Sequence, residues 1–249
     1  MKVLVTGATG FVGKKLARSL VNNRHSVSVL TRDTESARKR LPLTCEFHKW
    51  EPELYPPSSQ AFDGVDAVIH LAGENIADGR WTSKRKNSIK NSRVLSTRNL
   101  VSTLKSMTNS PGIFVSASAV GFYGKDRPVE LYEDLNPGKD FLAEVCKEWE
   151  HEAFAAQAHN VRTIALRIGI VLGYEGGAMK KMLPPFWAGA GGNLGDGNQW
   201  MSWIHVNDLV GMIIHCLENN SIQGVYNATS PHPVTNRIFT KCLAKSLRR

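Results

Sequence analysis

The stretch from Lys2 to Gly13, KVLVTGATGFVG, constrains the fold of this chain more than any other part of it. Its first five residues are mostly apolar and show no period, which predicts a buried strand. Three glycines follow, and a helix is expected after them. A strand that runs through a glycine-rich turn into a helix predicts a nucleotide-phosphate site, because free N–H groups at a helix start bind anions. The helix is marked by apolar residues at Phe11, Val12, Leu16, Leu20 and Val21.

Each glycine of this turn has its own expected role. Gly7 lets the chain turn sharply as it leaves the strand, and Gly10 lets the backbone approach a pyrophosphate with no Cβ in the way. Gly13 lets the helix pack closely on the strand. The spacing is G-x-x-G-x-x-G, which differs from the G-x-G-x-x-G of the ordinary dinucleotide fingerprint. We expect the cofactor contacts of this segment at Gly7, Thr9, Gly10, Phe11, Val12 and Gly13.

A second strand is expected from Ser26 to Thr31, and Arg32 follows it directly. At this place in dinucleotide-binding folds, a carboxylate holds a free ribose 2′-hydroxyl, whereas an arginine accommodates a 2′-phosphate. Thr31 and Arg32 therefore favour NADP(H) over NAD(H) as the cofactor. Two alternatives stay open: a shift of one residue would place Asp33 at the ribose, or Arg32 is only a solvated loop residue.

The segment from Asp66 to Gly73 predicts a further strand that ends in a turn of small residues. We expect Leu71, Ala72 and Gly73 to face the cofactor, because a bulky side chain would occupy the groove of the dinucleotide. His70, at the end of the strand, is expected to pack or to hydrogen-bond the backbone rather than to catalyse.

A set of short motifs continues along the chain: Gly73-Glu74-Asn75-Ile76-Ala77, Arg80-Trp81-Thr82, Ser92-Arg93, Ser116 to Gly124, Asn136-Pro137-Gly138, Asp140-Phe141-Leu142, Trp149-Glu150, Gly176 to Met179 and Trp203-Ile204-His205. With the opening turn, this set resembles the extended branch of the short-chain dehydrogenase/reductase superfamily. It is most similar to an atypical, sugar-nucleotide-epimerase-like family that includes the plant giant chloroplast protein and a human epimerase-family protein. The resemblance covers essentially the whole chain. It implies an α/β fold, a doubly wound parallel sheet of the NAD(P)-binding Rossmann type with a small C-terminal substrate lobe.

Six basic side chains and no acidic one lie between Arg80 and Arg93. In the resembling family an arginine at the position of Arg93 contacts the cofactor, and we assign that role to Arg93. The other five cations are either a solvated helix face or a nucleic-acid surface. The sequence disfavours nucleic acid as a partner, because no stacking aromatics alternate with the charges.

The resemblance also implies where chemistry would occur. In the superfamily a serine hydrogen-bonds the substrate oxygen, and a tyrosine four residues before a lysine moves the proton. That spacing puts phenol and ammonium on one helix face, where the ammonium lowers the pKa of the phenol. Ser118 matches the serine and Lys147 the lysine, but Ala143 stands at the tyrosine position. Tyr123, on the same loop as Ser118, is an alternative proton donor, although in relatives this tyrosine is structural.

Two functions from different classes therefore stay open. The chain is an NADP(H)-dependent oxidoreductase or epimerase acting on a small polar or nucleotide-linked substrate, or it is a catalytically inactive NADP(H)-binding module. The tyrosine position, Ala143, favours the second. Lys147 binds the nicotinamide ribose in the first interpretation, whereas an ion pair with Glu144 is its alternative use.

The 249 residues, 42% of them hydrophobic, suffice for one α/β domain with an added lobe. The glycine-rich stretch from Gly173 to Gly197 predicts a lid. Asn207 or Asp208 is expected to cap the helix that follows, and His205 to be an architectural hydrogen-bonder. Relatives carry further residues, so we expect the lobe to be cut short. The expected Rossmann core spans about 1–172, 203–219 and 224–229, and the lobe spans 173–202 and 230–249.

Composition excludes several other classes. The four cysteines show no C-x-x-C pair and no spacing with histidine for zinc, so we expect reduced thiols and no metal. No apolar run approaches the roughly 18 residues that span a bilayer, which favours a cytoplasmic protein without a membrane span. The net charge of +9 favours anionic ligands but decides nothing alone. The sequence identifies neither the small-molecule substrate nor the oligomeric state, and a homodimer stays open.

Overall fold

Seven parallel strands form one sheet in the computed structural model, which describes residues 1–41, 44–125 and 130–248. The strand order is β10-β6-β5-β4-β1-β2-β3. The chain therefore reverses its direction of winding between β1 and β4, which is where doubly wound sheets bind their ligands. This confirms the predicted fold class. The strands are β1 (Lys2–Thr6), β2 (Ser26–Thr31), β3 (Glu46–Lys49), β4 (Ala67–His70), β5 (Ile113–Ala119), β6 (Arg162–Ile168) and β10 (Gly224–Ala228).

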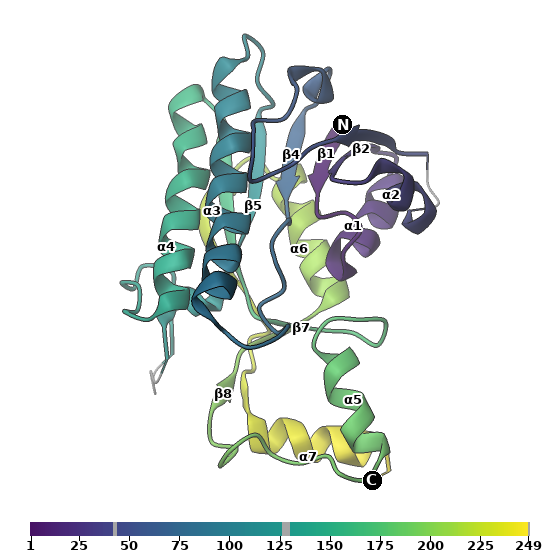
Figure 1. The fold of residues 1–249 in the computed structure, drawn as a ribbon, viewed down its shortest axis with the longest axis vertical. Coiled ribbons are helices and arrows are strands. Elements are labelled where there is room, and N and C mark those ends of the chain that lie inside the picture. The colour runs from purple at the N-terminus through teal and green to yellow at the C-terminus, as the bar shows by residue number, and fades with distance from the viewer. Residues whose placement is uncertain (42–43, 126–129, 249) are drawn as a thin grey trace.

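Helices cover both faces of this sheet (Figure 1). On one face lie α1 (Phe11–Asn22) and α6 (Val206–Glu218), and on the other lie α3 (Ser83–Ser106) and α4 (Phe141–Phe154). The short helix α2 (Thr34–Arg40) joins β2 to β3. Single 3₁₀ turns occupy Ser59–Phe62 (η1), Val120–Tyr123 (η2) and Ala155–His159 (η3).

Successive side chains of the buried strands point to opposite faces of the sheet and form two separate hydrophobic cores. In β1, Val3 and Val5 pack with the apolar faces of α1 and α6, whereas Leu4 packs with α3 and α4. In β5, Val115 and Phe114 divide between the two faces in the same way. Successive side chains of a strand point to opposite faces, so a sheet covered on both sides needs the unbroken apolar runs that the sequence contains.

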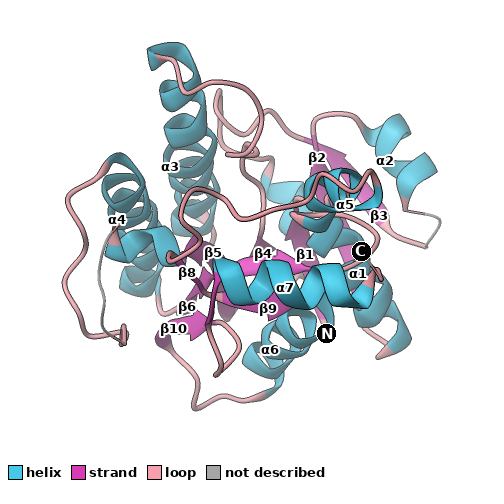
Figure 2. Ribbon diagram, turned by 90° about the horizontal axis from the view of Figure 1, so that it is seen from below, coloured by secondary structure: helices cyan, strands magenta, loops and turns pink. Residues whose placement is uncertain are grey.

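A small lobe lies across the carboxyl ends of the strands, as Figures 1 and 2 show. It contains α5 (Met179–Trp187), α7 (Asn236–Ser246) and the strand pair of β8 (Trp200–Met201) with β11 (Val234–Thr235). Leu183 and Phe186 of α5 pack against Leu243 of α7 as a core of their own. This core falls within the segments that the sequence assigned to the substrate lobe.

The mostly apolar stretch from Arg162 to Leu172 predicts a single unbroken strand. The structure differs, because the chain leaves the main sheet at Gly169. There Ile170 N donates to Ser202 O at 2.8 Å, and β7 (Ile170–Leu172) pairs with β9 (Trp203–His205). A Cβ at Gly169 would lie 2.7 Å from Ser202 O, so only glycine fits where the two segments cross.

The expected cap of α6 was also wrong. His205 is the N-cap, and its Nδ1 accepts from Asn207 N at 3.3 Å, whereas Asn207 and Asp208 lie inside the first turn. The architectural role expected for His205 is confirmed by this bond. No helix within the described residues is long and apolar enough to cross a membrane.

Candidate functional site

A cleft of about 230 Å³ opens at the carboxyl ends of β1, β2 and β4. Three segments that are far apart in the sequence meet there: the β1–α1 turn, the end of β2 and the turn after β4. Trp50 and Pro52, which no sequence motif indicated, complete the wall. The lining residues are Thr6, Gly7, Ala8, Thr9, Gly10, Val29, Leu30, Thr31, Arg32, Trp50, Pro52, Leu71, Ala72 and Gly73.

The glycines of the turn have the geometry that a close ligand needs. Gly7 has φ +70°, and a Cβ on it would lie 2.8 Å from Ala72 N. A Cβ on Gly13 would lie 2.2 Å from Gly7 O, so α1 packs against the turn at a distance that only glycine allows. Gly10 is exposed, and the nearest atom to a Cβ there is Gly7 O at 3.2 Å, so its outer face is open. Phe11, Val12 and Gly13 support the turn but do not line the cleft.

At the far end of the cleft, Arg32 is exposed and forms no ion pair or side-chain hydrogen bond among the described residues. The neighbouring carboxylate is used elsewhere. Asp33 is the N-cap of α2, and its Oδ1 accepts from Ser36 N at 2.9 Å. The register alternative that placed Asp33 at the ribose therefore loses support, because capping turns that carboxylate toward the helix.

The side chain of His70 supports the turn after β4 through hydrogen bonds. It is fully buried, with Nδ1 2.7 Å from Thr6 Oγ1 and Nε2 3.3 Å from Ser96 Oγ. Thr6 Oγ1 accepts from Ala72 N at 3.2 Å, so its hydroxyl proton is free to point at Nδ1 and the imidazole proton then sits on Nε2. Burial, and then the charge of Arg93, lower the pKa of His70 to about 3. Complete burial confirms the predicted packing role, whereas the hydrogen bonds go to side-chain hydroxyls and not to the backbone.

Arg93 lies behind the same turn rather than in the cleft. Its guanidinium donates to Glu74 O at 2.9 Å and to Ile89 O at 3.0 Å, and it stacks 5.4 Å above the Trp149 ring. A Cβ on Gly73 would lie 3.3 Å from the guanidinium carbon. Arg93 thus fixes the turn, and its predicted contact with the cofactor stays a prediction.

Ser118 belongs to a buried polar network that the sequence did not reveal. Its hydroxyl donates to Glu150 Oε1 at 2.6 Å, and Arg167 binds both oxygens of Glu150 at 2.9 and 3.0 Å. Arg167 also donates to the Tyr123 hydroxyl at 2.9 Å, which in turn donates to Asn227 Oδ1 at 2.7 Å. The protons of both candidate hydroxyls are therefore already engaged.

One sequence signal could have found this network. Arg167 interrupts the apolar run from Ile164 to Ile168 in β6, and a charge that is 3% exposed needs a buried partner. Glu150, 7% exposed on α4, is that partner. Arg167 also lies 3.4 Å from the Phe122 ring centroid. Tyr123 is 1% exposed and bonded at its hydroxyl, which matches the structural role that the resemblance implied for it.

Lys147 does not lie with this network, and its predicted contact with the nicotinamide ribose stays a prediction. It is exposed, whereas Cys146 and Glu150 on the adjoining strip of α4 are buried toward Ser118. Burial and the Glu150 charge raise the pKa of the Cys146 thiol to about 11, partly offset by Arg93 and Ser118.

One turn earlier on the same strip, Leu142 packs against Gly121. The strip of α4 on the side of Ser118 thus carries Leu142, Cys146 and Glu150. No phenol and ammonium pair faces Ser118 within the described part of the chain.

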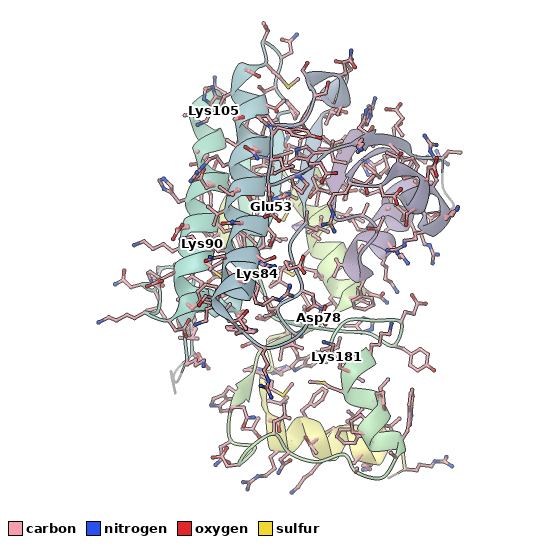
Figure 3. The ribbon with its side chains drawn as sticks, viewed as in Figure 1. Glu53, Asp78, Lys84, Lys90, Lys105 and Lys181 are labelled. Carbon is pink, nitrogen blue, oxygen red and sulfur yellow. The ribbon has the colours of Figure 1, made fainter. Side chains whose placement is uncertain are left out.

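The glycine-rich segment after β7 rests on the first residue of α1. Cβ atoms on Gly173 and Gly176 would each lie 2.7 Å from the Phe11 ring. Farther along, Lys181 of α5 hydrogen-bonds Asp78 and Ala77 O, and Figure 3 shows Lys181 and Asp78 side by side. The first part of the predicted lid therefore contacts the start of α1 and the loop after β4.

The basic helix α3, along which Figure 3 labels Lys84, Lys90 and Lys105, is partly neutralised by carboxylates. Arg85 pairs with Glu74 at 2.6 Å, and Lys90 pairs with Glu148 of α4 at 2.6 Å. Such pairing removes charge that a nucleic-acid surface would need.

Side chains that could hold a metal are not gathered anywhere among the described residues. The four cysteines are free thiols, of which only Cys242 is exposed.

Comparison with known proteins identifies the family. The model of the NAD dependent epimerase/dehydratase family matches residues 3–229. This chain belongs to that epimerase/dehydratase family. Among curated epimerase-family proteins, the SDR39U1 homolog, chloroplastic, of Arabidopsis thaliana is 42% identical over 243 residues, which are 94% of this chain and 67% of the relative. YfhF of Bacillus subtilis is 37% identical over 250 residues, covering 100% of this chain and 80% of the relative.

Solved structures of epimerase-family proteins agree with the fold. Human epimerase family protein SDR39U1 (isoform 2) with NADPH has a TM-score of 0.86 and 33% identity, and the match covers 100% of this chain and 81% of that one. UDP-glucuronic acid 4-epimerase from Bacillus cereus, in complex with UDP-glucuronic acid and NAD, has a TM-score of 0.86 at 22% identity, with 100% and 84% covered. The second likeness concerns the fold alone. The predicted family resemblance is confirmed.

Proposed function

We propose that this chain is an NADP(H)-binding member of the epimerase family and that the dinucleotide lies in the cleft between the glycine turn and the turn after β4. The observation that carries the proposal is the convergence of Gly7, Gly10 and Arg32 on one cleft at the switch point of the sheet. The pyrophosphate would bind the N–H groups of the turn, and the adenosine would extend toward the end of β2.

The choice of NADP(H) over NAD(H) rests on charge. Arg32 is the only charged side chain among the described residues that line the cleft, and no carboxylate is present there to hold a free 2′-hydroxyl. A guanidinium forms bidentate, charge-assisted bonds with a phosphate. The human relative, 33% identical, was crystallised with NADPH, which supports the same choice.

Hydride chemistry needs a proton donor as well as a cofactor. Here the geometry favours a dinucleotide-binding role without the tyrosine and lysine pair that moves the proton in the superfamily. The Ser118 hydroxyl is bonded to Glu150, the Tyr123 hydroxyl is bonded to Asn227, and Lys147 is exposed. An oxidoreductase or epimerase acting on a small polar or nucleotide-linked substrate is the second candidate function. Membership of the epimerase family is what favours it.

Cofactor selection is tested by titrating NADPH and NADH against intrinsic fluorescence, because the buried Trp50 lines the cleft. Wild-type protein should prefer NADPH, and Arg32→Ala should lose about tenfold or more in NADPH affinity, since a bond to a charged group contributes about 1.5–3 kcal/mol. NADH affinity should not change. Lys39→Ala removes an equal charge from the exposed face of α2 and serves as the control. Equal affinity of the wild type for both dinucleotides would refute the assignment.

Catalysis is tested separately, by following oxidation of bound NADPH with a panel of carbonyl compounds and sugar nucleotides. Ser118→Ala provides the comparison. Turnover that disappears in this variant while NADPH still binds would establish the second candidate function. If no compound is turned over by the wild type, the chain acts as a dinucleotide-binding module.

A further inference from the structure

A second cleft, of about 530 Å³, lies beyond the dinucleotide cleft and shares no lining residue with it. It opens beside the carboxyl end of β10, between the segment 130–133, strand β8 and the segment 229–233 that leads into β11. Its volume lies within the roughly 300–1,000 Å³ typical of small-molecule sites.

Two aromatic side chains line this cleft and are unusually exposed. Tyr132 is 58% and Trp200 is 60% exposed. Large apolar rings left in water at the edge of a concave surface are typical of binding sites. They offer flat apolar faces on which a ring-shaped ligand can stack.

The polar lining is acidic and rich in hydroxyls. Glu130 and Glu133 line the cleft, and neither carboxylate forms an ion pair within the described residues. Glu130 Oε2 accepts a hydrogen bond from the Tyr132 hydroxyl, which leaves Oε1 for a ligand. Hydroxyls come from Ser202, Thr229 and Ser230. Neither lysine nor arginine occurs among the residues of the described chain that form this wall.

Both walls are held in place by hydrogen bonds within the protein. Asn227 N donates to Glu133 Oε1 at 2.7 Å, and Asn227 Nδ2 donates to Leu131 O at 3.0 Å, which fixes the acidic segment to β10. On the other side Trp200 is paired with Thr235 in the β8–β11 ladder. A site whose walls are fixed in advance loses less free energy in ordering them on binding.

We propose that this cleft binds a neutral or amino sugar that carries no nucleoside diphosphate. The C–H faces of a pyranose stack on aromatic rings, and its hydroxyls donate to carboxylates such as Glu130 and Glu133. A pyrophosphate would meet two like charges, and no lysine or arginine among the described lining residues would offset them, which selects against nucleotide-linked sugars. This inference goes beyond the dinucleotide role, because sugar binding can be measured without cofactor.

The test uses ligands that differ mainly in charge: methyl glucoside, methyl glucosaminide, methyl glucuronide and UDP-glucose. Each is titrated against the full 249-residue chain by saturation-transfer NMR, with and without NADPH. The neutral and amino glycosides should bind. Methyl glucuronide should bind about tenfold more weakly than methyl glucoside, a difference of about 1.4 kcal/mol in binding free energy. UDP-glucose should bind no more tightly than methyl glucoside.

Two variants locate the binding. Trp200→Ala should weaken methyl glucoside about tenfold, whereas Trp187→Ala, which removes a 48% exposed tryptophan of α5 outside the cleft, should change affinity less than about twofold. Glu133→Gln keeps an acceptor for Asn227 N but removes the charge. It should therefore reduce the difference in affinity between methyl glucosaminide and methyl glucuronide.

Several outcomes would overturn the proposal. They are the absence of saturation transfer from every glycoside, tighter binding of UDP-glucose than of methyl glucoside, and equal effects of the Trp200 and Trp187 substitutions. NADPH affinity, measured on each variant, reports whether the fold is intact. Because NADPH affinity is scored independently, a failure of the dinucleotide proposal is distinguishable from a failure of this one.

Discussion

His70 should make this protein sensitive to mild acid although it touches no ligand. The ring is fully buried between Thr6 and Ser96, and its pKa is lowered to about 3, first by burial and then by the charge of Arg93. In the unfolded chain a histidine titrates at about 6.5. Between these two values the unfolded state binds one proton that the native state excludes, so stability is lost as the pH falls through this window.

The size of the effect follows from that difference. Over the whole window from pH 6.5 to pH 3, the free energy of unfolding falls by about 5 kcal/mol. The part between pH 6.5 and pH 5.0 accounts for about 2 kcal/mol of this loss. The second figure is nearly the same for any native pKa well below 5. A loss of that size is a large fraction of the 5–15 kcal/mol that is typical for a domain.

The assay is urea unfolding at pH 6.5 and pH 5.0 for the wild type and for His70→Gln, which keeps an acceptor and a donor but does not titrate. Other groups titrate equally in both proteins, so the difference between their pH dependences isolates the ring. The wild type should lose about 2 kcal/mol more than the variant over this interval.

An NMR titration of the labelled imidazole is the second measurement and needs no variant. The ring should stay neutral, with its proton on Nε2, down to pH 5. Identical pH dependences of the two proteins, or a ring that protonates near pH 6.5, would refute the reasoning.

Three further predictions follow from the site. Glu150→Gln leaves the Arg167 guanidinium buried without its counter-ion and should cost about 3 kcal/mol in urea unfolding, whereas Glu152→Gln, in an exposed pair, should cost under about 1 kcal/mol. Lys147→Ala should change NADPH affinity less than about twofold, because the side chain is exposed. A tenfold loss would instead show that Lys147 contacts the cofactor. Gly13→Ala, whose Cβ would meet a carbonyl oxygen at 2.2 Å, should abolish NADPH binding in the same titration.

Local spacing in the sequence was sufficient for the dinucleotide half of the molecule. The three glycines, the apolar strand before them and Arg32 at the end of the second strand all act within one β-α-β unit, so their positions follow from short-range geometry. Trp50 could not be assigned in the same way, because it reaches the cleft only through the pairing of β3 with β2.

The Ser118 region shows why the rest needed the tertiary structure. Ser118, Glu150 and Arg167 come from β5, α4 and β6, and their bonds depend on how a helix is rotated over the sheet. The resemblance matched Lys147 to the family's lysine, but a shift of one residue turns a helical side chain by about 100°, and the residue of α4 that is buried is Cys146.

The sequence by itself therefore determined the glycine cradle, whose residues lie close together along the chain, and the family and fold class, which follow from short motifs spread over the whole chain. Only the tertiary structure decided which hydroxyls and charges are already bonded to one another, and that a second, acidic and aromatic cleft exists beside β10. Those features depend on the packing of segments about a hundred residues apart, such as Tyr123 and Asn227, which no local pattern encodes.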